Sequence, residues 1–124
     1  MSANLNRVTL IGRLGADPEV RQSKSGNAYA RLSLATNRRG KDEHTDWHRI
    51  LVFGKLAEVC ERCLHKGSLC CFEGRIEYSE RKNPDAKSTY FTSIIGERMT
   101  MLDPRKRRGG SKDWREQEHD VDAF

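Results

Sequence analysis

The chain has 124 residues, of which 33% are charged, and its net charge is +5. This length is ordinarily one domain, and the absence of both a run near ~18 apolar residues and a signal-peptide segment after Met1 predicts a soluble, cytoplasmic protein. A basic balance points only weakly to nucleic acid, because many soluble proteins share it.

Two strands are predicted in the first third of the chain. Arg7 to Arg13 is rich in Val, Leu and Ile, and the turn signal Gly15 to Pro18 follows it. Ala28 to Thr36 alternates with a period of two, which puts Tyr29, Arg31 and Ser33 on one face. The other face carries Ala28, Ala30, Leu32, Leu34 and Thr36.

The stretch from Asp46 to Phe53 predicts a third strand whose two faces differ sharply. One face carries Trp47, Arg49, Leu51 and Phe53, and the other His48, Ile50 and Val52. An indole, a guanidinium and a phenyl ring in line suit unpaired bases, because every base offers a π-face and Arg can contact phosphate or stack. From the pattern alone, Trp47 and Phe53 are equally compatible with packing in a core.

A short helix and two further strands complete the predicted fold. Lys55 to His65 has an apolar stripe and a basic, glycine-terminated end, which is typical of a helix. Leu69 to Tyr78 and Tyr90 to Arg98 alternate as strands. Three strands, one helix and two strands is the order of an OB-fold, an all-β, five-stranded Greek-key barrel that binds oligonucleotides, although other small barrels share this order.

Four motifs resemble the bacterial single-stranded DNA-binding protein family, over roughly residues 4 to 104. They are NRVTLIGRLGADPEVR (Asn6 to Arg21), LATN (Leu34 to Asn37), DWHRILVFGKLAE (Asp46 to Glu58) and KGS (Lys66 to Ser68). The resemblance implies an OB-fold with a short helix between its third and fourth strands, assembly as a homotetramer, and no cofactor. It also implies that the protein coats single-stranded DNA.

The resemblance further assigns roles to individual residues. Trp47 and Phe53 match aromatics that stack on bases, which contributes ~1–3 kcal/mol per base. Lys55 matches a basic residue on the DNA path, and His48 matches a position near the subunit interface. Weaker candidates for phosphate contacts are Arg7, Arg21, Arg31, Arg49 and Lys66.

The chain departs from the family at two positions where stacking aromatics are usual. The loop from Arg38 to Thr45 is short and holds no aromatic residue. A stacking Trp in the arm between the last two strands is replaced by Arg81, with Tyr78 as a nearby substitute. We therefore expect weaker or more salt-sensitive binding per subunit than in a typical member, with Arg81 offsetting part of the loss.

The four cysteines do not predict a metal site. Cys60 and Cys63 lie on the apolar stripe of the helix, where cysteine acts as a small hydrophobe. Cys70 and Cys71 are adjacent on a strand and face opposite ways, so they do not readily join one zinc tetrahedron. Because the sequence also shows no nucleophile with a base and no phosphate-cradling glycine loop, we expect a protein that is not an enzyme.

The last twenty residues predict a separate, disordered tail. Residues 1–104 form the predicted OB domain, residues 105–112 are basic, and residues 113–124 are acidic with a terminal Phe. In the family an acidic tip ending in Pro-Phe docks into basic, apolar pockets of replication, recombination and repair proteins. Here the corresponding residues are Asp120, Asp122, Ala123 and Phe124, with Ala123 in place of Pro. An ordinary solvated tail is the alternative.

The sequence thus predicts a short-tailed, nucleoid-associated protein that binds single-stranded DNA without strong sequence preference and recruits partners through its tip. Two alternatives stay open. One is a primosomal adaptor of the same fold, which the acidic tip argues against. The other is a protein-interaction OB module that binds little DNA, which Trp47, Phe53 and Lys55 argue against.

Overall fold

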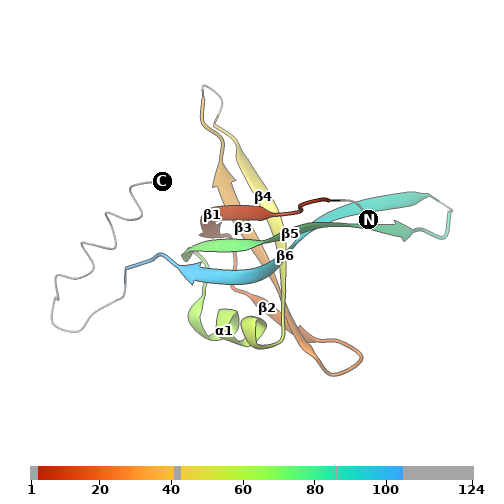
Figure 1. Cartoon of the computed structure of the whole chain (residues 1–124), viewed down its shortest axis with the longest axis horizontal. Helices are drawn as coiled ribbons and strands as arrows, with labels where there is room; N and C mark the ends of the chain where they lie inside the picture. The colour runs from red at the N-terminus through yellow and green to blue at the C-terminus, as the bar shows by residue number, and fades with distance from the viewer. Residues whose placement is uncertain (1–2, 41–42, 86, 105–124) are drawn as a thin grey trace.

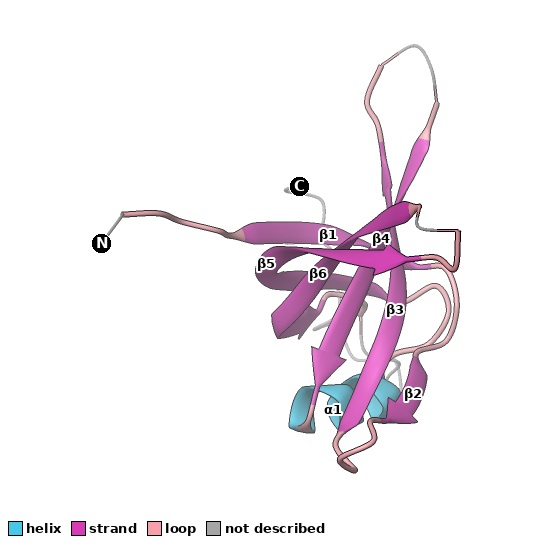
Figure 2. Cartoon of the chain, turned by 90° about the vertical axis from the view of Figure 1, so that its right-hand side faces the viewer, coloured by secondary structure: helices cyan, strands magenta, loops and turns pink. Residues whose placement is uncertain are grey.

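The computed structural model describes residues 3–40, 43–85 and 87–104. These segments form six strands and one helix, arranged as in Figures 1 and 2: β1 (Val8–Leu14), β2 (Glu19–Gln22), β3 (Ala28–Asn37), β4 (Thr45–Phe53), α1 (Lys55–Cys63), β5 (Leu69–Lys82) and β6 (Ser88–Met101). In the described part of the chain, no helix combines the length and apolarity needed to span a membrane.

The strands close into a barrel. Their order is β1-β5-β6-β4-β3, and β1 pairs back with β3, which joins the two ends of the sheet. The β4–β6 pair is parallel at Ile50 and Ile94, whereas the other pairs are antiparallel. Helix α1 follows β4 and precedes β5 in the chain, and it covers one end of the barrel (Figure 1). This arrangement confirms the predicted OB-fold.

Strand β2 is an addition to the five predicted strands. It pairs with one end of β3, from Glu19 opposite Arg31 to Gln22 opposite Ala28, while β1 pairs with the other end of β3. Strands β1 and β2 therefore pair along the same edge of β3, and the predicted turn from Gly15 to Pro18 separates them in the chain. The segment EVRQ has no hydrophobic alternation, so only its pairing with β3 identifies it as a strand.

Several predicted element ends were wrong by two residues or more. The helix ends at Cys63 instead of His65, because Leu64 takes extended backbone (φ −110°, ψ 151°) and is only 5% exposed. Strands β5 and β6 continue to Lys82 and begin at Ser88, beyond the predicted limits of Tyr78 and Tyr90. The extra residues form a paired arm, residues 77–82 and 88–93, that projects from the barrel (Figure 1).

The core fills the barrel from the inward faces of its strands. Its largest fully buried side chains are Phe72, Leu34, Ile50, Val52, Cys60 and Cys70. Ala30, Leu32 and Leu34 alternate with exposed Arg31 and Ser33, which confirms the two predicted faces of β3. At Gly74 a Cβ would overlap the carbonyl oxygen of Ile95, so the absence of a side chain lets β5 and β6 approach closely beside the β-bulge between Glu73 and Gly74.

Candidate nucleic-acid interface

The outward faces of β3 and β4 form one continuous surface. In register, Ala35 lies opposite Trp47, Ser33 opposite Arg49, Arg31 opposite Leu51, and Tyr29 opposite Phe53. Residues that pair directly across antiparallel strands project to the same face. Trp47 is 60% exposed and Phe53 is 51% exposed, which excludes the alternative that they are core aromatics.

One end of this surface carries two aromatic rings and a lysine. The rings of Tyr29 and Phe53 lie with their centroids 6.2 Å apart and their planes tilted by 34°. Lys55 opens α1 immediately after Gly54, whose positive φ of 63° turns the chain from β4 into the helix. Lys55 is exposed and follows Phe53 by two residues in the chain.

At the other end, the Trp47 indole lies over Gly15. A Cβ at Gly15 would overlap the indole ring, so the absence of a side chain there gives the ring its place. Trp47, Arg31 and Arg49 line a shallow hollow of about 330 Å³, the Trp47 hollow, together with Ala16, Asp17, Glu19, Leu32, Ser33 and His48. The Nε2 atom of His48 lies 2.8 Å from the Thr36 hydroxyl. The location of His48 near a subunit interface stays a prediction.

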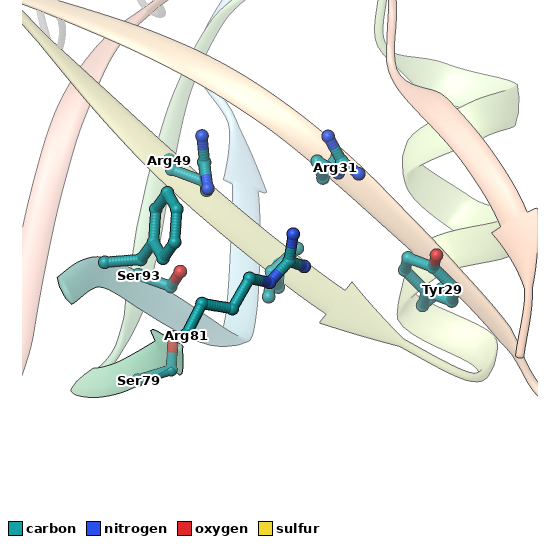
Figure 3. A pocket seen from close by; sticks show the side chains of 8 residues that line it. Tyr29, Arg31, Arg49, Ser79, Arg81 and Ser93 are labelled. Atoms are coloured by element: carbon teal, nitrogen blue, oxygen red, sulfur yellow. The ribbon is translucent and has the colours of Figure 1, made fainter. Parts of the chain in front are cut away.

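A second hollow lies between β3, β4 and the arm. It measures about 380 Å³ and is called the central hollow here; its lining residues are Tyr29, Arg31, Arg49, Leu51, Ser79, Arg81, Phe91 and Ser93. Figure 3 shows Arg81 reaching from β5 toward β4, with Arg31 and Arg49 across the hollow. The guanidinium carbons of Arg49 and Arg81 lie 5.5 and 5.6 Å from the centroid of the Phe91 ring.

The charges in the central hollow are of one sign. No acidic side chain lines it, and Arg31, Arg49 and Arg81 form no ion pair with any residue that the structure describes. Such uncompensated guanidinium groups suit bidentate contacts to phosphate oxygens.

Several arginines that line neither hollow are already paired with carboxylates. Arg38 donates from Nε and Nη2 to the two carboxylate oxygens of Asp46, both at 3.0 Å. The hydrogen bond from Arg38 lowers the pKa of Asp46, and the same bond raises the pKa of Arg38. Arg21 forms an ion pair with Glu19. These arginines are therefore partly neutralised before any anion approaches.

The structure does not bring together every predicted contact residue. Arg21 lies opposite Tyr29, on the same face, but it carries its own counter-charge. The backbone N–H of Lys66 donates to Asp17, which lines the Trp47 hollow. Arg7 is exposed just before β1 and lines neither hollow.

Tyr78 lies on the opposite face of the arm from Arg81. It pairs with Thr92, whereas Ser79 pairs with Phe91 and Arg81 with Thr89. Alternation along β5 therefore directs Ser79 and Arg81 to the hollow and Tyr78, which is 72% exposed, away from it. Tyr78 does not substitute at the central hollow for the aromatic that is absent at position 81.

Phe91 is the residue that the sequence analysis missed. It begins an alternation with Ser93 on β6, but the strand was predicted without assigning its faces. The aromatic pair Tyr90-Phe91 was the available signal, because one ring of any adjacent pair on a strand must face each side.

The cysteines pack as hydrophobic side chains. Burial raises the pKa of the Cys60 thiol to about 11 and that of Cys70 to about 12. Cys71 points to the other side of β5 and is only half-buried. Among the residues described, no group of three or more His, Cys, Asp or Glu side chains is placed to hold a metal ion.

The predicted tail and its tip, which includes Asp120, Asp122, Ala123 and Phe124, lie outside the described residues.

Taken together, these features define a small OB-fold protein with a basic, aromatic groove across β3, β4 and the arm. The single-strand binding protein family model matches residues 5–102. The chain belongs to this family. Its members are DNA-binding proteins without enzymatic activity, in agreement with the predicted absence of catalysis.

Similar proteins span most of the chain. A "Single-stranded DNA-binding protein" of Xylella fastidiosa is 40% identical over 116 residues, covering 89% of this chain and 71% of the relative. "Single-stranded DNA-binding protein 1" of Chlorobaculum tepidum is 40% identical over 122 residues, covering 91% and 74%. The solved structure "Plasmodium falciparum SSB complex with ssDNA" has a TM-score of 0.77 and 29% identity, covering 83% of this chain and 99% of that chain.

Proposed function

We propose that this protein binds single-stranded DNA without strong sequence preference, along the groove formed by the outward faces of β3, β4 and the arm. The observation that carries the proposal is the groove itself, where exposed Trp47 and Phe53 flank three arginines that form no ion pair with a described carboxylate. Aromatic rings stack on any base, and arginines follow the phosphate backbone. Membership of the single-strand binding family and the likeness to a protein solved with ssDNA support it.

The test is a titration of the full-length Trp114→Phe variant with oligo-dT, in which Trp47 is the sole indole. Saturable quenching of its fluorescence is expected, with affinity that falls steeply as salt rises. Arg49→Ala should lower the salt slope by about 0.7 if Arg49 contacts one phosphate. Arg62→Ala, an exposed arginine on α1, is the matched control and should leave the slope unchanged. Absence of binding at low salt would overturn the proposal.

The second part of the proposal concerns the tail. The OB domain spans residues 1–104, and residues 105–124 act as a disordered tail whose acidic tip recruits replication, recombination and repair proteins in the cytoplasm. The support is the spacing of Asp120 and Asp122 before the terminal Phe124, which suits capture of a carboxylate and an aromatic ring by a basic pocket. Phe124→Ala should abolish co-purification of such proteins and leave oligo-dT affinity unchanged; retained co-purification would contradict it.

The third part is assembly as a homotetramer, with His48 near a subunit interface. His48 is partly buried in the single chain and lies on the face of β4 that carries the buried Ile50 and Val52. Light scattering coupled to size-exclusion chromatography should give four times the mass of one chain, and a monomeric mass would refute this part.

A further inference from the structure

We propose that the central hollow holds one base of the bound strand, stacked on Phe91, while Arg49 and Arg81 contact the neighbouring phosphates. This inference rests on the proposed function and adds a stacking position to it. The hollow brings together residues of four strands that the sequence separates: Tyr29 and Arg31 from β3, Arg49 from β4, Ser79 and Arg81 from β5, and Phe91 and Ser93 from β6.

The two arginines are placed to bind an anion beside the Phe91 ring. Their guanidinium carbons lie 5.5 and 5.6 Å from its centroid, within the range of a cation–π contact. A cation–π contact uses no N–H donor of the guanidinium group. The donors of both arginines can therefore form bidentate hydrogen bonds to phosphate oxygens while they lie near the Phe91 ring.

The remaining lining suits a planar, neutral group next to those cations. Ser79 and Ser93 are small and leave space beside the ring, and no acidic side chain lines the hollow to repel a phosphate. A volume of about 380 Å³ lies near the lower end of the range for sites that hold small ligands. The hollow thus fits a single nucleotide better than a run of several.

The central hollow also lies on the path of the groove. Arg31 and Arg49 line both the central hollow and the Trp47 hollow, so the two adjoin. Single-stranded DNA with one base on Trp47 can therefore continue to Phe91 along Arg31 and Arg49, which line both hollows.

The other face of the arm offers the competing position. Tyr78 and Tyr90, 72% and 71% exposed, are diagonal neighbours there. No arginine is in cation–π contact with either tyrosine ring among the described residues, whereas two flank Phe91. The structure therefore assigns the base to the Phe91 face of the arm. Binding on the tyrosine face is the alternative that the test below can detect.

The test compares full-length Phe91→Leu with full-length Tyr90→Leu, since both changes remove one ring from adjacent positions of β6 and keep apolar bulk. Each variant and the wild type are titrated with oligo-dT and with an abasic oligonucleotide of equal length. Phe91→Leu should weaken oligo-dT binding about fivefold or more and leave abasic binding within about twofold. Tyr90→Leu should change neither. Equal oligo-dT affinity of Phe91→Leu and wild type, or a loss confined to Tyr90→Leu, overturns the proposal.

A photo-crosslinking experiment on the wild type avoids any dependence on variant folding. Oligonucleotides that carry 5-iododeoxyuridine are bound and irradiated, and the modified residue is mapped by mass spectrometry. An adduct at Phe91 supports the proposal, while adducts at Trp47 and Phe53 without one at Phe91 refute it and leave ssDNA binding intact. If the wild type binds no oligonucleotide, the proposed function fails and this inference fails with it.

Discussion

Replacing Gly15 with alanine tests whether the position of the Trp47 indole controls affinity for single-stranded DNA. An added Cβ would overlap the ring and would lie 2.9 Å from its Cη2 atom and 3.4 Å from its Cε3 atom. Carbon atoms pack at about 3.5–4.0 Å, so the ring must retreat by on the order of 1 Å. Because the ring is the exposed end of a side chain, the retreat should cost the folded state under about 0.5 kcal/mol.

The expected loss of binding follows from the stacking contribution. Truncation of a stacking aromatic costs ~1–3 kcal/mol per base, and displacement of the ring should forfeit the lower part of that range, about 1 kcal/mol or roughly fivefold in Kd. Fluorescence titration with oligo-dT measures Kd for wild type, Gly15→Ala, Trp47→Ala and the double variant. In the Trp47→Ala background, Gly15→Ala should have no further effect.

Two results would refute this reasoning. The first is a Gly15→Ala affinity equal to that of the wild type. The second is an equal loss from Gly15→Ala in the presence and absence of the indole, because the effect would then not pass through Trp47. Thermal unfolding of each variant controls for a general loss of folded protein.

Three further predictions concern stability and reactivity. Phe72→Ala, at a fully buried position, should lower the free energy of urea unfolding by about 3–5 kcal/mol. The hydrogen bond from Arg38 holds the pKa of Asp46 below the ordinary aspartate value of 3.8, so this pairing stabilises the fold above that pH and stops doing so as pH falls through the lowered pKa. The Tm difference between wild type and Asp46→Ala should therefore shrink on acidification below pH 3.8. With thiol pKa values of about 11 and 12, Cys60 and Cys70 should resist iodoacetamide in the native protein at about pH 8 and react in urea, as peptide mass spectrometry would record.

Each of these has a clear contrary result. A loss below about 1.5 kcal/mol for Phe72→Ala would mean that the barrel interior repacks around the cavity. If the Tm difference between wild type and Asp46→Ala grows on acidification, the Arg38–Asp46 pair does not stabilise the fold in the predicted way. Rapid native labelling of Cys60 would place its thiol at the surface.

Several features of the fold and site could be predicted from the sequence because they depend on local alternation. The period of two in Ala28–Thr36 and Asp46–Phe53 assigns each residue to a face, and one face of each strand is apolar enough to be the core. The exposure of Trp47 and Phe53 follows from that alternation once Ile50 and Val52 are buried. The resemblance of four motifs then predicted the family, and the match of the family model confirms it.

Other features depend on pairing between distant segments. The four residues of β2 are a strand only because β3 offers them an edge, and their own pattern does not predict it. The length of the arm decides which way Tyr78 and Arg81 point: three residues apart on a continuous strand, they face opposite sides.

The sequence by itself thus determined the order of the helix and of every strand except β2, the inward faces of β3 and β4, and the aromatic and basic character of β4. All of these follow from neighbouring residues along one segment. Only the tertiary structure decided that Arg49 and Arg81 both contact the Phe91 ring, and that Gly15 lies under the Trp47 indole. The physical reason is that these contacts depend on the register across β4, β5 and β6. The β-bulge, the length of the arm and the closure of the barrel together set that register, and no single segment of the sequence encodes it.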